Sequence, residues 1–372
     1  MKKRVLISVT NDLATDQRVK KVCGSLNELG YDILLIGRKL PDSLPLNRSY
    51  ATFRMRLVFN KGPLFYAEYN IRLFLLLLFS KATVFHANDL DTILANFIAS
   101  KIRGIPLVYD SHEYFTGVPE IQNKPLVKAI WLSIERWIFP KLNDVFTVNK
   151  SIAKLYKNDY NKDLRILRNI PHKITISSYK TREELQLPEN QNIVITQGAG
   201  INIDRGIEEA VEAMQYLPNV CLLIIGNGDV IPQLKKRTVE LNLEKNVIFK
   251  GRMPYEEMMQ HTHHAALGLT LDKDTNINYK FSLPNKLFDY IHAGIPVLAS
   301  KVIEVENIIN SYNVGLFIDN HTPKHIAAQI RKALEDESLR EKWKLNSTRA
   351  KNELHWKNEE KELIEVYAHI ES

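Results

Sequence analysis

The feature that most constrains the fold is an alternation of short, almost continuous apolar runs with amphipathic helical patterns. In the first half of the chain, RVLISV (4–9), TVFHAN (83–88) and PLVYDSHE (106–113) have the length and apolar character of buried strands. Helical patterns at 16–30 and 90–104 separate them. Strands of this kind occur in parallel sheets whose two faces are both covered by helices. The first half therefore predicts a doubly wound α/β domain.

The same alternation begins again after a polar stretch at 174–191, with the apolar runs NIVITQGAG, VCLLIIGNG and IPVLAS. With 372 residues, the chain is too long for one ordinary core. We therefore expect two Rossmann-like α/β domains, 1–172 and 192–354, joined by a linker at 173–191. A last helix, at about 355–372, is expected to pack back on the first domain.

Composition and charge narrow the class of protein. The longest apolar run, 73–79, is about a third of the roughly 20 residues that a membrane-spanning helix needs. No secretory cleavage pattern follows the first strand, so we expect a cytoplasmic protein in which Cys23 and Cys221 remain free thiols. The net charge of +7 favours anionic partners such as phosphates or acidic lipids. The basic residues are scattered and form no recognition helix, so no nucleic-acid partner is expected.

Ligands of doubly wound sheets bind beyond the carboxyl ends of the strands, which directs attention to VYDSHEYF. This segment places Asp110, His112 and Glu113 at the end of a buried strand, beside an expected interdomain cleft. His112 is positioned to donate to a substrate oxygen or to act as an acid or base. The alternative is a structural histidine bonded to the backbone.

Other strand ends carry glycines and an arginine. In GAGINIDRG, Arg205 lies close to a helix start, where backbone N–H groups and a guanidinium bind phosphate; a solvated arginine in a flexible turn is the alternative. Gly226 and Gly228 form half of a dinucleotide fingerprint, but Ile231 occupies the third glycine position. Gly251 lets the backbone approach a planar ligand or simply makes a tight turn.

The most informative segment is YKFSLPNKLFDYIHAGIPVLAS, residues 279–300. Ser282 is predicted to cap a helix that begins at Leu283, with Pro284 in its first turn. Lys286 and Asp289, three residues apart, then share a helix face. The ammonium suits a diphosphate, and the carboxylate can accept hydrogen bonds from a ribose diol. A surface salt bridge is the alternative, and it leaves the Ser-Leu-Pro-Asn turn unexplained.

Three patterns receive a plainer interpretation. The D-x-D pairs at 89–91 and 272–274 are common by chance, and HTHH (261–264) has no carboxylate or cysteine at a fixed spacing to complete a metal site. We therefore expect no metal. The aromatic and basic segment 124–141 has helical spacing, for which core packing is the default and an interfacial membrane helix the alternative.

Taken together, these segments resemble the retaining glycosyltransferases of family 4, which have the GT-B fold of two facing Rossmann-like domains with a deep cleft between them. The resemblance covers essentially the whole chain, and its most specific part is PNKLFDYIHAGIPVLAS. The other segments that carry it are TDQRVKKVCGSLNELGYDILLIG, HANDLDT, LVYDSHEYF, DVFTVNKSIAKLY, RNIP, RGIEEAVEAM, LLIIGNGD and VIFKGRMP.

The resemblance implies a nucleoside-diphosphate sugar bound mainly by the second domain, with no metal or other cofactor. Asp289 matches the acidic residue that holds the ribose, and Arg205 and Lys286 match the cations that stabilise the leaving diphosphate. His112 matches a position that contacts the donor sugar. The other residues expected to bind the donor are Gly198, Gly226, Gly228, Gly251, Arg252, Met253, Ser282, Leu283 and Pro284. The acceptor-side candidates are Asp16, Arg18, Asp89 and Glu113.

Two positions depart from the family pattern. Phe281 stands where a glutamate usually contacts the donor hexose, and Gly200 and Arg205 stand where the family has an arginine and a lysine. We expect a hexosyl- or related glycosyltransferase that acts with retention on a glycan or lipid-linked acceptor in cell-envelope glycoconjugate synthesis. Contact with the inner face of the cell membrane is a further expectation, and first-domain loops such as 38–70 and 114–127 are expected to read the acceptor. The alternatives are a nucleotide-sugar epimerase of the same architecture and a non-catalytic nucleotide-sugar or membrane-surface binding protein.

Overall fold

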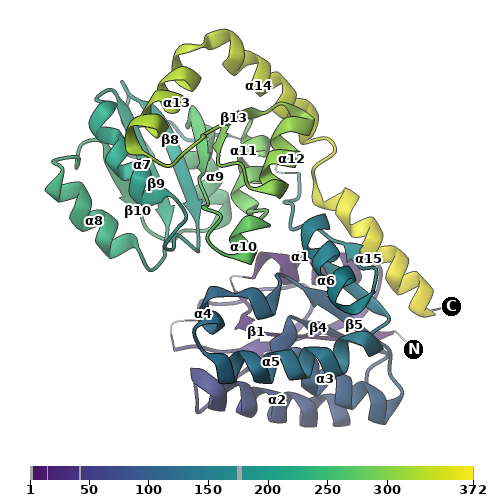
Figure 1. Ribbon diagram of the computed structural model, residues 1–372. Coiled ribbons are helices and arrows are strands. Elements are labelled where there is room, and N and C mark those ends of the chain that lie inside the picture. Colours follow the sequence, from purple (N-terminus) through teal and green to yellow (C-terminus); the bar gives the residue numbers. More distant parts are fainter. Residues whose placement is uncertain (1–2, 15, 42, 174–177, 372) are drawn as a thin grey trace. The chain divides into compact units, whose positions relative to one another are not determined.

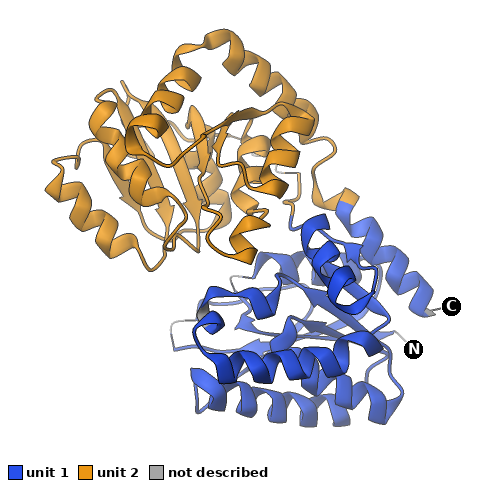
Figure 2. Ribbon diagram, in the orientation of Figure 1, with its two compact units in different colours: residues 1–169, 359–372 blue, residues 170–358 orange. Residues whose placement is uncertain are grey.

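The computed structural model describes residues 3–14, 16–41, 43–173 and 178–371. Its contacts divide the chain into two compact units, shown in two colours in Figure 2. Unit 1 consists of residues 1–169 and 359–372, and unit 2 of residues 170–358. The predicted linker includes residues 174–177, which lie outside the described residues. Leu185 and Leu187, from the same segment, are buried in the core of unit 2.

Within the described residues, unit 1 contains a seven-stranded parallel sheet in the order β3-β2-β1-β4-β5-β6-β7. The strand order reverses between β1 and β4, which are hydrogen-bonded neighbours. This reversal is the point at which doubly wound sheets bind ligands. The strands are β1 (Arg4–Asp12), β2 (Asp32–Arg38), β3 (Ala51–Met55), β4 (Val84–Asn88), β5 (Leu107–Ser111), β6 (Asp144–Thr147) and β7 (Arg165–Ile166).

Helices cover both faces of this sheet, as Figure 1 shows. One layer contains α1 (Gln17–Glu28), α6 (Lys150–Tyr160) and α15 (Trp356–Glu371), and the other contains α2 (Gly62–Phe79), α3 (Leu90–Arg103) and α5 (Pro125–Ile138). Phe65, Tyr69, Leu73 and Leu77 recur every fourth residue along α2, so they form one stripe that is buried against β1 and β4. Burial of this stripe fixes α2 on the sheet.

The segments predicted as acceptor-reading loops are partly regular structure, which corrects that expectation. Residues 38–70 include β3 and the start of α2, and residues 114–127 include a 3₁₀ turn (Phe115–Gly117), α4 (Pro119–Gln122) and the start of α5. The edge strand β3 is mostly exposed and lacks a buried apolar run. In α2, exposed apolar side chains such as Leu64 and Ile71 hide the helical period.

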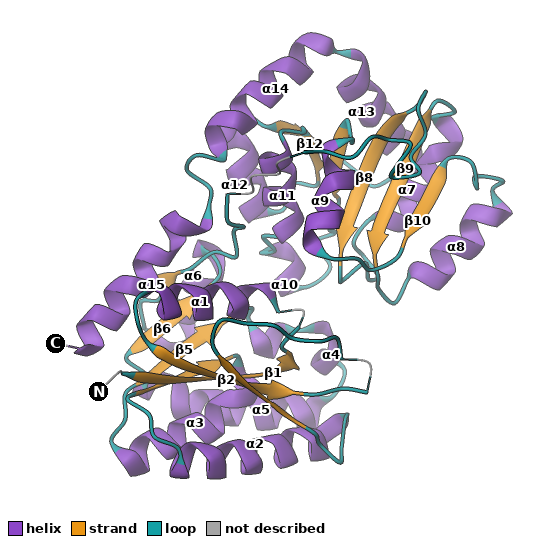
Figure 3. Ribbon diagram, turned by 180° about the vertical axis from the view of Figure 1, so that it is seen from behind, coloured by secondary structure: helices purple, strands orange, loops and turns teal. Residues whose placement is uncertain are grey.

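Unit 2 contains a six-stranded parallel sheet within the described residues, in the order β10-β9-β8-β11-β12-β13 (Figure 3). Its strand order reverses between β8 and β11. The prediction of two doubly wound α/β domains is confirmed. The strands are β8 (Asn192–Gly198), β9 (Val220–Gly226), β10 (Val247–Lys250), β11 (Leu267–Thr270), β12 (Val297–Ala299) and β13 (Gly315–Phe317).

Side chains of alternate residues in the buried strands pack in two separate apolar cores, one on each face of the sheet. Val194 belongs to the core shared with α7, α8 and α13, whereas Ile193 and Ile195 belong to the core shared with α11 and α12. Cys23 and Cys221 are buried free thiols, as predicted. The helices are α7 (Ile207–Ala213), α8 (Ile231–Glu240), α9 (Tyr255–His263), α10 (Ile277–Lys280), α11 (Asn285–Ala293), α12 (Ile303–Tyr312), α13 (Pro323–Glu335) and α14 (Glu337–Ala350).

Candidate functional site

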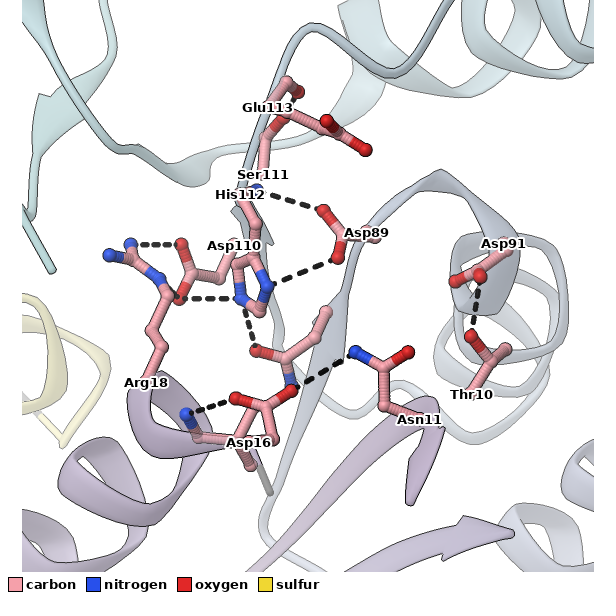
Figure 4. A network of polar contacts seen from close by, with 12 residues as sticks. Thr10, Asn11, Asp16, Arg18, Asp89, Asp91, Asp110, Ser111, His112 and Glu113 are labelled. Carbon is pink, nitrogen blue, oxygen red and sulfur yellow. Dashed lines mark hydrogen bonds and ion pairs between the residues drawn. The ribbon is translucent and has the colours of Figure 1, made fainter. Parts of the chain in front are cut away.

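A polar cluster lies at the carboxyl end of the unit 1 sheet, where the strand order reverses (Figure 4). Arg18, on α1, forms two bonds with Asp110 at the end of β5: Nη2 to Oδ1 at 2.5 Å and Nε to Oδ2 at 2.9 Å. Both side chains are buried. Burial acts to raise the pKa of Asp110, but the guanidinium of Arg18 and the hydrogen bond from His112 hold this pKa below its ordinary value. Asp110 is therefore an ionised, bidentate anchor for Arg18.

His112 follows β5 and lies between two carboxylates (Figure 4). Its Nδ1 is 3.1 Å from Asp89 Oδ2, and its backbone N–H donates to Asp89 Oδ1 at 2.8 Å. Its Nε2 is 3.1 Å from Asn88 Oδ1 and 3.5 Å from Asp110 Oδ2. Burial lowers the pKa of His112, yet Asp89 and Asp110 outweigh burial and raise it well above its ordinary value.

The structure places the other predicted acceptor-side residues in different settings. Asp16 caps α1 by accepting from the backbone N–H of Val19, and Arg18 is only 3% exposed because its ion pair is inside the domain. Asp89 is engaged with His112, whereas Glu113 is exposed. Of the predicted set, therefore, Glu113 offers its side chain most openly to solvent.

Asp91 lies beside this cluster in the first turn of α3 and accepts a 2.5 Å hydrogen bond from Thr10 Oγ1. Burial, together with the charge of Asp89, raises the pKa of Asp91 to about 7. Its other carboxylate oxygen has no hydrogen-bond partner among the described residues. Asp91 therefore lies in the first turn of a helix, a position where the helix dipole favours a negative charge.

A second polar cluster lies in unit 2, where β11 ends beside β8. Arg205 Nη1 bonds Asp272 Oδ2 at 2.6 Å, and its guanidinium stacks 4.1 Å above the ring of Tyr279. Ser282 Oγ donates to the same oxygen of Asp272 at 3.0 Å. Asp272 is fully buried. The arginine predicted to grip a phosphate is thus held in place by the carboxylate of Asp272.

Lys286 belongs to the same cluster and, among the described residues, has no hydrogen-bond or ion-pair partner. Burial lowers the pKa of Lys286; the charge of Asp272 opposes this effect and the nearby Arg205 adds to it. Lys286 is half-buried, and an ammonium without a carboxylate at bonding distance, next to a second cation, lacks the neutralising partner that cations shielded from water normally have. An anionic ligand such as a phosphate would supply that partner.

Asp289, one turn further along α11, is buried. Its Oδ1 accepts from Tyr255 Oη at 2.6 Å and its Oδ2 accepts from Gln197 Nε2 at 3.1 Å. Gln197 is oriented in turn by Thr262, whose Oγ1 donates to Gln197 Oε1 at 2.7 Å. The carboxylate predicted to hold a ribose is therefore positioned by two side chains, those of Tyr255 and Gln197.

The predicted helix start is wrong by two residues, because α11 begins at Asn285 and its N-cap is Pro284. The Ser282 side chain bonds Asp272 instead of capping the helix, and Leu283 packs against the unit 2 core. Proline fixes its own φ near −65° and disfavours helical geometry in the residue before it, so the helix starts after Pro284. Lys286 consequently lies in the first turn of α11.

Two glycines of the predicted donor site have a packing role. A Cβ on Gly226 would lie 1.8 Å from the carbonyl oxygen of Gly198, and one on Gly228 would lie 1.9 Å from that of Ile201. The loops after β8 and β9 therefore pack backbone against backbone. Gly251, Arg252 and Met253 form the turn after β10, where Gly251 is exposed and a Cβ on it would meet nothing.

Metal-ligating residues do not converge in the parts of the chain that the structure describes: no group of three or more His, Cys, Asp and Glu side chains there could hold a metal ion. In the HTHH segment, His263 stacks on Tyr179 with ring centroids 3.5 Å apart, and His261 Nδ1 bonds the Glu257 carbonyl. These histidines have structural contacts.

Two family profiles match the chain. Glycosyl transferases group 1 matches residues 177–350, and Glycosyltransferase Family 4 matches residues 16–171. The chain carries two glycosyltransferase domains. Unit 1 holds the family 4 domain with the His112 cluster, and unit 2 holds the group 1 domain with Arg205, Lys286 and Asp289.

Known proteins show the same architecture. The lipopolysaccharide core biosynthesis glycosyltransferase LpsD of Rhizobium meliloti is 24% identical over 190 residues, which are 51% of this chain and 52% of that protein. Sucrose-phosphate synthase of Thermosynechococcus elongatus has a TM-score of 0.79 at 16% identity over 99% of both chains. Anabaena HepE, solved with UDP and glucose, has a TM-score of 0.76 at 14% identity over 99% of this chain and 100% of its own. The predicted GT-B fold of two Rossmann-like domains is confirmed.

The chain spans 61% of the length of one curated relative and 52% of another. Sequence reasoning missed four residues that hydrogen-bond the predicted site residues His112, Asp289 and Arg205. They are Asn88, Gln197, Tyr255 and Asp272. Asp272 was visible as an acid directly after an apolar strand, the position where ligand-binding residues were sought. Gln197 and Tyr255 carried no comparable signal, because their partner Asp289 is distant in sequence.

Proposed function

We propose that the protein is a glycosyltransferase that takes a sugar from a nucleoside-diphosphate donor bound by unit 2 and transfers it, with retention, to a glycan or lipid-linked acceptor. The observation that carries this proposal is the cation cluster at the carboxyl edge of the unit 2 sheet. There Arg205 is oriented by Asp272, and Lys286 has no neutralising partner in the described chain. Two cations and one carboxylate leave a net positive site for a diphosphate.

Each cluster residue has a distinct task in this proposal. Lys286 and Arg205 stabilise the negative charge that develops on the leaving diphosphate, which a fixed cation does best in a water-poor site. Asp289 accepts hydrogen bonds from the ribose diol, and the turn 251–253 lies beside the base. The departing diphosphate assists attack on the same face of the sugar, so no protein nucleophile is needed. His112, a residue of unit 1, is proposed to act on the donor sugar.

The donor class is supported by UDP in complex with HepE, and we expect a hexose or a related sugar. Ligand binding to the folded state raises the melting temperature, so a thermal-shift panel of nucleotide sugars identifies the donor. The matched pair of variants is Lys286→Ala and Lys280→Ala, since Lys280 is exposed and pairs with Asp274. The shift given by UDP is expected to vanish in the first variant and to persist in the second. An equal shift in both would contradict the proposal.

The same architecture also serves epimerases, which would convert the donor sugar without an acceptor, and non-catalytic binding proteins, which would leave the donor intact. Product analysis of the donor incubated alone separates the three. Free sugar and free nucleoside diphosphate support a transferase that uses water as a poor acceptor. An epimeric nucleotide sugar, or an unchanged donor together with no transfer, supports one of the alternatives.

A surface of unit 1 suits the acceptor side of the reaction. Among the described residues, none of the helices has the length and apolarity needed to cross a bilayer. Two helices of the α2–α3–α5 layer, however, carry exposed apolar side chains: Leu64, Ile71 and Phe79 on α2, and Leu126, Ile130 and Trp137 on α5. We name this set the apolar face.

Cations accompany the apolar face, and its charge pattern indicates the partner. Lys124, Lys128 and Arg136 belong to α5 or precede it, and Lys141 Nζ lies 5.0 Å from the centre of the Trp137 ring. The carboxylate of α5, Glu135, is turned inward and buried. Exposed apolar groups with cations around them match an anionic lipid surface. We therefore propose that this face rests on the inner leaflet of the cell membrane.

A further inference from the structure

Three acceptor groups surround the imidazole of His112 in unit 1. Asp89 Oδ2 lies 3.1 Å from Nδ1, Asn88 Oδ1 lies 3.1 Å from Nε2, and Asp110 Oδ2 lies 3.5 Å from Nε2. The Asn88 amide cannot be turned the other way, because its Nδ2 donates to the carbonyl oxygen of Ser8 at 3.0 Å. A backbone carbonyl only accepts. Asn88 therefore presents its oxygen, not its N–H₂, to the ring.

An imidazole with an acceptor at each nitrogen must carry a proton on each nitrogen to bond both. We propose that His112 is a permanently protonated imidazolium whose charge and orientation are set by Asn88 and Asp89, and that it acts on the substrate as a fixed cation instead of as a proton acceptor. Asn88 and Asp89 are then positioning residues. This inference rests on the proposed function only for the identity of the substrate.

The charges around the ring balance in this state. Asp89 and Asp110 supply two negative charges, and Arg18 and a protonated His112 supply two positive charges. Loss of the proton from His112 would leave Asp89 without a cation at bonding distance in a partly buried site, which is costly. The raised pKa of His112, caused by Asp89 and Asp110 against the opposing effect of burial, agrees with this balance.

Among the described residues, the other titratable groups near the ring do not provide a second base or cation in contact with it. His86, on β4, is buried, and desolvation lowers its pKa to about 4, so it is neutral. Asp91, on α3, bonds Thr10, and Glu113 is exposed. The carboxylates at bonding distance are thus Asp89 from the start of α3 and Asp110 from β5.

The chemical consequence concerns proton transfer in the proposed reaction. A doubly protonated ring has no lone pair, so His112 cannot take the proton of an acceptor hydroxyl. Its partly exposed edge instead places a positive charge next to an oxygen of the substrate. The proton of the acceptor must then go to an oxygen of the departing diphosphate, which becomes more basic as its bond to the sugar breaks.

Nitrogen-15 NMR of the full-length protein with labelled histidine tests the charge directly. The His112 signals are assigned by their absence in His112→Gln. Between about pH 5 and about pH 8, where an ordinary histidine loses a proton, both ring nitrogens of His112 are expected to stay protonated. Asp89→Asn is expected to lower the pKa of His112, so that a neutral form appears within this range. Asp91→Asn, the same change two residues away, is the control and is expected to leave the ring protonated.

A neutral His112 tautomer at neutral pH in the wild-type protein would overturn the proposal, and so would an unchanged titration in Asp89→Asn. If the Asp89 variant fails to fold, Asn88→Asp provides the second test, since a third carboxylate around the ring is expected to keep it protonated to higher pH. A deprotonated ring in that variant contradicts the proposal. The NMR readout needs no substrate, so its failure and the failure of the proposed transfer reaction are distinguishable.

Discussion

Arg205 and Asp272 form an ion pair at the centre of the proposed donor site of unit 2, with Nη1 and Oδ2 2.6 Å apart. The two residues are 67 positions apart and come from the loops that follow β8 and β11. Burial of Asp272 keeps water from competing for its carboxylate oxygen. The ring of Tyr279 stacks against the guanidinium of Arg205 and restricts its movement. The pair orients the guanidinium of Arg205 but carries no net charge. The ammonium of Lys286 therefore supplies the net positive charge of the cluster.

Replacing Asp272 should therefore weaken the fold of unit 2. In Asp272→Ala, Arg205 and Ser282 lose their shared acceptor, and we expect the free energy of unfolding to fall by about 1–3 kcal/mol. Urea denaturation of the purified protein measures the change. Asp274→Ala, which removes an exposed acid two residues away, is the matched control and should be close to wild type. Equal stability of the two variants would show that the Arg205–Asp272 pair contributes nothing.

Asp289 should discriminate between ribose and deoxyribose. Its carboxylate accepts from Tyr255 and Gln197 and is expected to accept also from the ribose diol of the donor. Wild type should bind UDP more tightly than 2′-deoxy-UDP, by about 10-fold, which corresponds to one hydrogen bond to a charged group. Asp289→Asn should lose most of this preference because an amide has one acceptor oxygen and no charge. Calorimetric titration of both nucleotides measures it, and a preference that survives in the variant would place the ribose elsewhere.

Glu135 should make the stability of unit 1 depend on pH. Burial raises its pKa from 4.5 to about 7, so between these values the folded state keeps a proton that the unfolded chain has lost. The free energy of unfolding should fall as the pH rises through this window, by roughly 3 kcal/mol at most for this group. Glu135→Gln should reduce the fall, whereas Glu341→Gln, an exposed control, should not. Denaturation midpoints at a series of pH values measure the slope; the same slope in both variants would contradict this assignment.

The apolar face of unit 1 should bind vesicles that contain anionic lipid. We expect the protein to sediment with such vesicles at low salt, and to be released as salt screens the cations. Leu126→Glu/Ile130→Glu should abolish sedimentation because it puts carboxylates on the contact surface. Val239→Glu/Leu345→Glu makes the same change at exposed positions of unit 2 and should sediment like wild type. Loss of binding in both double variants, or in neither, would exclude this face as the membrane contact.

The elements that could be predicted from the sequence are those whose signal is local. Buried strands such as β1, β4 and β9 are continuous apolar runs, and Gly294 ends α11 in the left-handed conformation that glycine favours. In α2 the signal fails, because apolar residues on both sides of the helix erase its period. The start of α11 was misplaced because a serine two residues before a proline satisfies the rules for a cap, whereas the Ser282 side chain bonds Asp272.

The candidate site could be predicted from the sequence as single residues but not as pairs. His112 and Arg205 were selected because each follows a strand, and Lys286 and Asp289 because they share one face of a predicted helix and match a family motif; their roles stay predictions. Their partners depend on which strands become neighbours, and β8 lies next to β11 although β9 and β10 lie between them in sequence. No local sequence pattern indicates that Asp272 bonds Arg205 or that Tyr255 bonds Asp289. Those contacts determine which charged side chains have a partner within the protein and which, like that of Lys286, are available to a ligand.

The most direct test of the account is the turnover of the nucleotide sugar that stabilises the protein most, measured for wild type, Lys286→Ala, Arg205→Ala and the control Lys280→Ala. Removing a preorganised group that stabilises transition-state charge typically costs about 100-fold or more. We predict such a loss in both Lys286→Ala and Arg205→Ala, with folding confirmed by circular dichroism, and near wild-type turnover in Lys280→Ala. Near-normal turnover in both folded site variants would contradict the claim that these two cations of unit 2 hold the diphosphate of the donor.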